Sequence, residues 1–188
     1  MQNMQTICER HGRIENSTKP KVASTEGNEM ETACNEIVAD LLEKKGSSSK
    51  SNSVSLQGYV DLGLPSGTLW KATNEYGYYD YDSAVNKYGD KLPTREQWEE
   101  LKNYCTWQWT GKGYKVVSDN GKFIVLPAAG SRYCTGSIGS VGSVGVYWSS
   151  TPSDSKNAWV LSFCSDSVDM FSFYGHCNGL SVRLVHNP

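Results

Sequence analysis

The spacing of hydrophobic residues predicts a helix near the N-terminus. Between residues 28 and 46, apolar side chains recur every three or four positions, which is the pattern of an amphipathic helix. Asn28 can cap its start, and Gly46 can end it. A single helix of this length is not stable alone in water, so its apolar face must pack on something. Docking on the main domain is favoured over pairing with copies of the chain into a homo-oligomer. The apolar face consists of Met30, Ala33, Cys34, Ile37, Val38, Leu41 and Leu42.

The same pattern, together with local composition, divides the chain into four parts. Residues 1–25 are polar without a period and are predicted to be poorly ordered, and residues 26–46 carry the helix. Residues 47–55 are rich in Ser, Lys and Asn, which is typical of a flexible linker. Residues 56–188 are dense in aromatic residues, glycines and turns, and we expect them to form the main domain.

Several short elements are predicted within the main domain. Two strands flank a turn at residues 65–67, and a hairpin surrounds the Asp-Asn-Gly turn at residues 119–121. A helix begins after Thr94, with Gln97 at the position of a capping box, and Trp98 and Leu101 on its buried face. The segment "GLSVRLV" is expected to form a final strand. Several short strands, one clear helix and long loops predict an α+β fold.

Residues 157–163, "NAWVLSF", alternate in a way that predicts one inward and one outward face of a strand. We assign Trp159, Leu161 and Phe163 to the core. Val160, Ser162 and Cys164 are then expected to face solvent.

Composition and charge exclude some classes of function. The net charge of −2 and the 38% of hydrophobic residues show no bias toward nucleic acid or acidic lipid. No apolar run is long enough to span a membrane, so no membrane insertion is expected. The first residues lack the apolar core of a secretory signal, so a place on a cell surface or virion would need another export route, a removed leader or assembly into a particle.

The six cysteines and the clustered acidic residues do not match a metal-binding motif. No CxxC pair occurs, so we expect mostly free thiols, with Cys105 and Cys134 as the one pair to examine for a disulfide. Asp154, Asp166 and Asp169 could hold Ca²⁺, but the capping of turns by Asp154 and Asp166 is favoured. No metal or other cofactor is predicted.

Five segments in the main domain carry a family resemblance: "YVDLGLPSGTLW", "LPTREQWEELKNYCTW", "LPAAGSR", "YWSSTPSDSKNAW" and "GLSVRLV". Residues 56–188 resemble the C-type lectin-fold domains of gut Bacteroidetes and their phages, whose fold is related to that of formylglycine-generating enzymes. The resemblance implies an α+β, C-type lectin fold with short twisted antiparallel strands, long loops and an N-terminal helical extension. The tail most resembles the variable proteins of diversity-generating retroelements, in which adenines of a template are miscopied and the ligand-binding surface is rewritten.

This resemblance implies a variable surface between residues 153 and 180. Adenine changes in the Asn codon AAC cannot produce Lys, Gln, Glu, Met or Trp, and no Glu follows Glu100 and no Gln follows Gln108. Lys156 is the only Lys beyond Lys122, and the two other residues that cannot be produced, Trp159 and Met170, fall where core is expected. The twelve candidates from Val160 onward all belong to the types that can be produced. The residues expected to bind ligand are Ser153, Ser155, Val160, Ser162, Cys164, Ser167, Asp169, Phe171, Ser172, Phe173, Tyr174, His176, Cys177 and Leu180.

The function expected from these residues is non-enzymatic binding of a protein or glycan on a cell surface, with aromatic side chains as anchors among small polar ones. His176 and Cys177 are adjacent, which disfavours a nucleophile–base pair. Two alternatives stay open: an invariant adhesion or structural domain of a surface or phage particle, and a copper oxidase of the formylglycine-generating type using Cys164 and Cys177.

Overall fold

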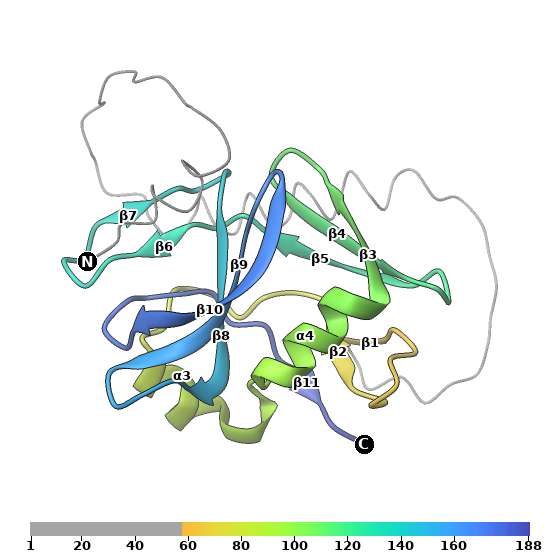
Figure 1. Cartoon of the computed structure of the whole chain (residues 1–188), viewed down its shortest axis with the longest axis horizontal. Coiled ribbons are helices and arrows are strands. Elements are labelled where there is room, and N and C mark those ends of the chain that lie inside the picture. Colours follow the sequence, from red (N-terminus) through yellow and green to blue (C-terminus); the bar gives the residue numbers. More distant parts are fainter. Residues whose placement is uncertain (1–57) are drawn as a thin grey trace.

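The computed structural model describes residues 58–188, and these residues form a mixed α+β fold. The predictions for residues 1–25, 26–46 and 47–55 lie outside the described residues. Helices α3 (Tyr81–Tyr88) and α4 (Arg95–Tyr104) flank the short 3-10 helix η1 (Gly89–Lys91). The other elements are short strands in small antiparallel sheets (Figure 1), and this confirms the predicted α+β class.

Four small sheets make up the rest of the fold. The order β1-β2-β11 pairs the start of the described chain with its end, and the order β3-β4-β5 forms a meander. Strands β6 and β7 form a two-stranded ribbon, and the fourth sheet has the order β10-β9-β8. The strands are β1 (Tyr59–Asp61), β2 (Leu69–Lys71), β3 (Cys105–Trp109), β4 (Gly113–Ser118), β5 (Phe123–Pro127), β6 (Ser131–Arg132), β7 (Ile138–Gly139), β8 (Gly145–Pro152), β9 (Asn157–Cys164), β10 (Ser167–Gly175) and β11 (Val185–His186).

Helix α4 forms as its sequence predicts. The Thr94 hydroxyl accepts from the Gln97 amide, and the Gln97 side chain accepts from the Thr94 amide, so the capping box satisfies two backbone donors. Trp98 and Leu101 are fully buried, whereas Tyr104 is exposed. The Trp98 indole N–H donates to the Trp148 carbonyl at 3.1 Å, which fixes α4 against β8.

The predicted turns are confirmed, but the predicted final strand is only partly correct. Strands β1 and β2 pair around residues 65–67, and β4 and β5 pair around residues 119–121. The segment 179–184 does not form one continuous strand, because it crosses between sheets and meets a different partner at each step. Its isolated bridges are Arg132 with Gly179, Tyr79 with Leu180, and Tyr147 with Ser181.

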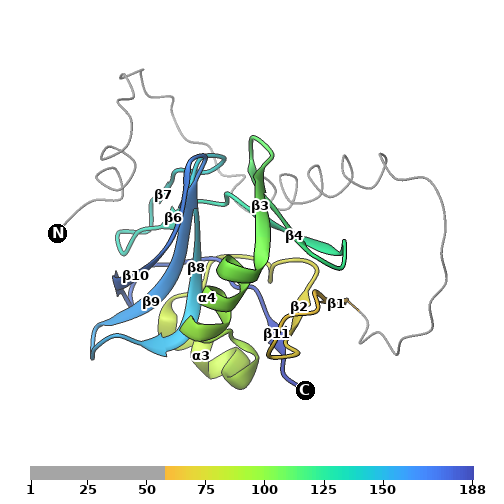
Figure 2. The same ribbon diagram turned by 45° about the vertical axis from the view of Figure 1, so that its right-hand side comes forward.

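Strand β9 lies at the centre of its sheet and is covered on both faces. Leu161 and Phe163 belong to one hydrophobic core, which we call the first core, together with Trp98 of α4. Val160 belongs to the other, the second core, together with residues of α3 and with Leu92, which follows η1. Helix α4 lies beside this sheet in both views (Figures 1 and 2) and contacts all three of its strands.

Arg183 is a fully buried cation between two sheets. One guanidinium nitrogen donates to the Lys71 carbonyl of β2 at 2.7 Å, and the other donates to the Val125 carbonyl of β5. A planar guanidinium can serve two carbonyls at once, whereas a lysine ammonium on a single stem cannot match this fork. Arg183 therefore joins the sheet that holds both chain ends to the β3-β4-β5 meander.

We predict that Arg183→Lys lowers the free energy of unfolding by about 1–3 kcal/mol, because a buried carbonyl loses its partner. Urea unfolding of the purified protein measures this. The matched control is Arg95→Lys, since Arg95 makes a partly exposed ion pair with Glu99 and its replacement should cost less than about 1 kcal/mol. Equal losses in the two variants would contradict the bridging role of Arg183.

Candidate functional site

Strand β10 is an edge strand with an irregular centre. It pairs with β9 from Ser167 to Phe171, but the register then shifts before Tyr174. Two residues, Ser172 and Phe173, therefore stand opposite the single residue Trp159, which is the arrangement of a β-bulge.

Next to the bulge, two neighbouring aromatic residues differ in their exposure to solvent. Phe173 is 49% exposed, whereas Tyr174 is 7% exposed and belongs to the second core. Its ring stays stacked on that of Phe173, with centroids 6.0 Å apart. The bulge is the physical reason that the sequence of β10 does not alternate cleanly.

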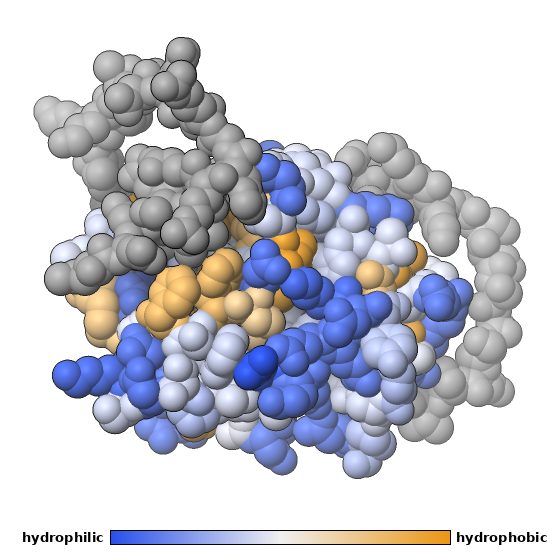
Figure 3. All heavy atoms as spheres, viewed as in Figure 1, coloured by the Kyte–Doolittle hydropathy of each residue, from blue (hydrophilic) through white to orange (hydrophobic). Residues whose placement is uncertain are grey.

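Hydrophobic side chains remain partly accessible along β10. Phe171 is half-buried, and its ring meets that of Phe173 edge to face at 5.6 Å. Val168 and Met170 are also half-buried, on the side of the first core. Figure 3 shows hydrophobic residues gathered from the left to the centre of the face in view, with hydrophilic ones below and to the right of them. At the start of the strand, the Lys102 ammonium of α4 lies 2.7 Å from the Asp169 carboxylate.

Nine of the fourteen predicted ligand-binding residues are at least partly exposed. They lie on β10, on the turn between β8 and β9, and on the loop that follows β10. Together these segments form what we call the β10 surface. Its residues are Ser153, Ser155, Ser167, Asp169, Phe171, Ser172, Phe173, His176 and Cys177.

The other five predicted residues are buried, so their assignment to a solvent-facing surface is wrong. The alternation in β9 was interpreted as one inward and one outward face, but the strand is packed on both. Tyr174 is turned inward by the bulge, and Leu180 pairs with Tyr79. Trp159, expected in the core, is half-buried beneath the Arg95 guanidinium, 3.9 Å from its ring centroid. The five buried residues are Val160, Ser162, Cys164, Tyr174 and Leu180.

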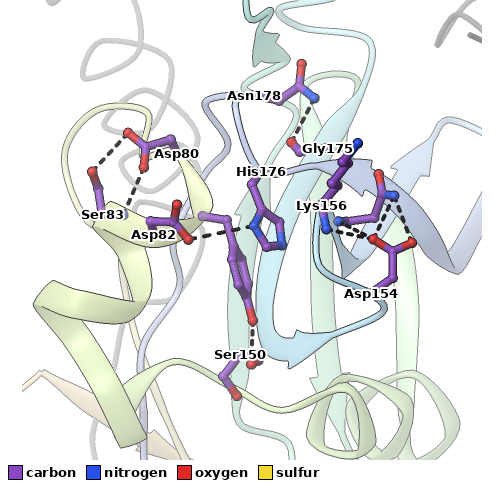
Figure 4. Close-up of polar contacts among 11 residues, drawn as sticks. Asp80, Asp82, Ser83, Ser150, Asp154, Lys156, Gly175, His176 and Asn178 are labelled. Atoms are coloured by element: carbon purple, nitrogen blue, oxygen red, sulfur yellow. Dashed lines mark hydrogen bonds and ion pairs between the residues drawn. The ribbon is translucent and has the colours of Figure 1, made fainter.

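His176 fixes the end of β10 against neighbouring elements (Figure 4). Its ring stacks on Tyr81 of α3 with centroids 4.3 Å apart, and its Nδ1 lies 3.7 Å from a carboxylate oxygen of Asp82. Its backbone N–H donates to the Lys156 carbonyl, and its carbonyl accepts from the Tyr81 N–H. The Tyr81 hydroxyl in turn donates to the Ser150 carbonyl at 2.8 Å. One residue thus holds β10, α3 and the β8–β9 turn together.

Two carboxylates cap the local turns around His176. Asp80 accepts from the Ser83 amide at the start of α3, and Asp154 accepts from the amides of Lys156 and Asn157. The backbone hydrogen bond from Ser83 lowers the pKa of Asp80, and the Asn157 side chain lowers the pKa of Asp154. Both groups are therefore anionic at neutral pH, and the turn-capping interpretation of Asp154 is confirmed.

Cys134 and Cys177 form a disulfide, with their Cα atoms 5.1 Å apart. The predicted pair Cys105 with Cys134 is therefore wrong, and so is the pairing of Cys164 with Cys177 for copper. Cys105 sits in β3 opposite Ser118 as a thiol, and burial raises its pKa to about 11. No spacing in the sequence signals the observed pair. The ends of β6 and of the tail are instead brought together by the backbone bridge between Arg132 and Gly179.

Within residues 58–188, no three His, Cys, Asp or Glu side chains are grouped so as to hold a metal ion. No helix of this part of the chain is long and apolar enough to cross a membrane.

Comparisons with protein-family models, curated proteins and solved structures found no match to this chain. Its function must therefore be inferred from the side chains of the β10 surface.

We predict that replacing Cys134 and Cys177 together by Ser lowers the free energy of unfolding by up to about 4 kcal/mol, because the disulfide closes a loop of 43 residues in the unfolded chain. Urea unfolding with and without a thiol reductant measures this. The reductant should lower the free energy of unfolding of the wild type and of the control variant Cys105→Ser by the same amount. It should not change the free energy of unfolding of the double variant. Insensitivity of the wild type to reductant would contradict the assignment.

Proposed function

We propose that this protein is a non-enzymatic receptor with a C-type lectin-type fold, and that a diversity-generating retroelement rewrites its β10 surface to bind varied protein or glycan targets. The observation that carries the proposal is the composition of that surface. All nine of its residues are of types that adenine changes in an AAC codon can produce, and they gather on one strand and two adjoining turns. The same segments also carry the exposed Lys156 and the half-buried Met170, whose types such changes cannot produce.

The β10 surface has the physical properties of a binding site. Phe171 and Phe173 offer contact area on side chains with few rotatable bonds, and the serines around them offer adaptable hydrogen bonds. Beneath them, β9 is fixed by two packed cores, so the scaffold need not change when the surface does. The α+β class and the short antiparallel strands are in keeping with the proposed fold.

The two residues that suggested catalysis have structural roles. His176 is stacked on Tyr81 and anchors three elements, and Cys177 is bonded to Cys134. Cys164 is buried, with its sulfur 3.3 Å from a carboxylate oxygen of Asp166. These contacts favour binding over a reaction that needs a free thiol beside an imidazole.

Sequencing of the gene's locus in related isolates tests this proposal. We expect a near-repeat of the coding tail beside a reverse transcriptase, differing at adenines. Between isolates, substitutions should fall on the β10 surface, except at His176 and Cys177, whose contacts fix the end of β10. The five buried residues should stay constant. Absence of the repeat, or equal variation at buried and exposed positions, would overturn the proposal in favour of an invariant adhesion domain.

A surface that is rewritten must change without unfolding its scaffold. We therefore predict that Phe173→Ser changes the free energy of unfolding by less than about 0.5 kcal/mol, since the side chain is largely exposed. Val160→Ser, which introduces a hydroxyl into the second core, should cost about 2–4 kcal/mol. Urea unfolding of both variants measures the contrast. A comparable loss at the two positions would show that β10 is part of the scaffold.

A further inference from the structure

The first core is open along one side, between β3 and β10. Five hydrophobic side chains pack against this core but are only partly buried. The Tyr114 hydroxyl of β4, the neighbour of β3, donates to the Ser165 carbonyl in the β9–β10 turn at 3.1 Å, and this ties the β3-β4-β5 sheet to the turn before β10. We call these side chains the β3–β10 strip. They are Cys105, Trp107, Trp109, Val168 and Met170.

The partly exposed residues at the edge of the second core carry polar groups, unlike the β3–β10 strip. There the Tyr79 and Tyr88 hydroxyls lie 3.0 Å apart and the Lys87 ammonium lies 3.2 Å from the Tyr79 hydroxyl. An apolar partner covering that border would have to displace water from these polar groups. The β3–β10 strip presents two indole rings, a thiol, a thioether and a valine, so it is the better match for an apolar partner.

The chain itself contains an apolar surface without an assigned partner. The predicted helix of residues 28–46 has seven apolar residues at i, i+3, i+4, i+7, i+8, i+11 and i+12, counted from Met30. A stripe this wide is typical of a helix that packs on a globular domain, whereas a coiled coil needs only a narrower seam. The width of the stripe therefore favours a domain surface over a second copy of the helix.

The connection between helix and domain is long enough for this contact. Twelve residues, 46–57, separate Lys45 from Gly58 and can span about 40 Å when extended. The described chain begins beside the first core, since Val60 of β1 packs against it. A tether this short also gives the helix a high effective concentration at the domain surface, which favours contact within one chain.

We propose that residues 29–45 form a helix that packs its apolar stripe on the β3–β10 strip of the same chain. Met170 and Phe171 lie on opposite faces of β10, because they pack on different cores. The helix therefore covers the face that carries Met170 and leaves Phe171 accessible. This contact does not depend on the proposed function.

The distribution of methionines provides a direct test. The chain has four, of which Met30 belongs to the predicted stripe and Met170 to the strip. We expect methyl NMR of the full chain with ¹³C-methyl methionine to show a nuclear Overhauser contact between Met30 and Met170. Leu41→Asp, which places a charge in the stripe, should abolish this contact and shift the Met170 resonance. The matched control Ala39→Asp adds the same charge outside the stripe and should change neither.

Two further outcomes decide against the proposal. A Met170 resonance that is the same in the wild type and in Leu41→Asp would show that the helix does not cover the strip. A contact that weakens on dilution, with the wild type sedimenting as an oligomer and Leu41→Asp as a monomer, would show that copies pair instead. Far-UV circular dichroism and the fluorescence of the buried tryptophans establish that the domain stays folded in both variants.

Discussion

The packing of β9 on both faces is the constraint on which the rest of the tail depends. In a strand with one buried and one solvent-exposed face, every second residue can be substituted without disturbing a core. Strand β9 has no such exposed face, because Leu161 is buried in the first core and Val160 is buried in the second. Under the proposed function, variation is therefore confined to the edge of the sheet and to its turns. The β10 surface lies there, and its position follows from the burial of its neighbour.

The bulge at Ser172 and Phe173 determines which side chains of β10 point into the second core and which point to solvent. The strand must return an anchoring side chain to the second core, and it must also present an aromatic ring to solvent. Without the extra residue, period-2 alternation would put Tyr174 on the face opposite Phe171. With it, both pack on the second core, and Phe173 is directed outward. His176 and the disulfide at Cys177 then fix the end of the strand, so the exposed residues are held between two anchored ends.

Local signals in the sequence predicted the elements well. The capping box at Thr94, the Asp-Asn-Gly turn at residues 119–121 and the presence of a strand at residues 157–163 each depend on residues close together in the chain, and each was confirmed. The number of layers around β9 was not predictable in this way, because alternation does not reveal what lies on the second face. The same limit applied to the cysteines, since the contact between Cys134 and Cys177 is set by the path of the chain between them.

These corrections make the proposed binding surface smaller than the sequence suggested. Of the aromatic residues in the tail, Phe173 is the most exposed, and Phe171 supports it from the side. Binding energy at protein interfaces concentrates in a few such anchors surrounded by polar side chains. Under the proposed function, changing the type of residue at these two positions would therefore alter ligand binding more than changing the serines around them. A scaffold that isolates its anchors on a bulge at the edge of a sheet can accept such changes, because no core residue has to move with them.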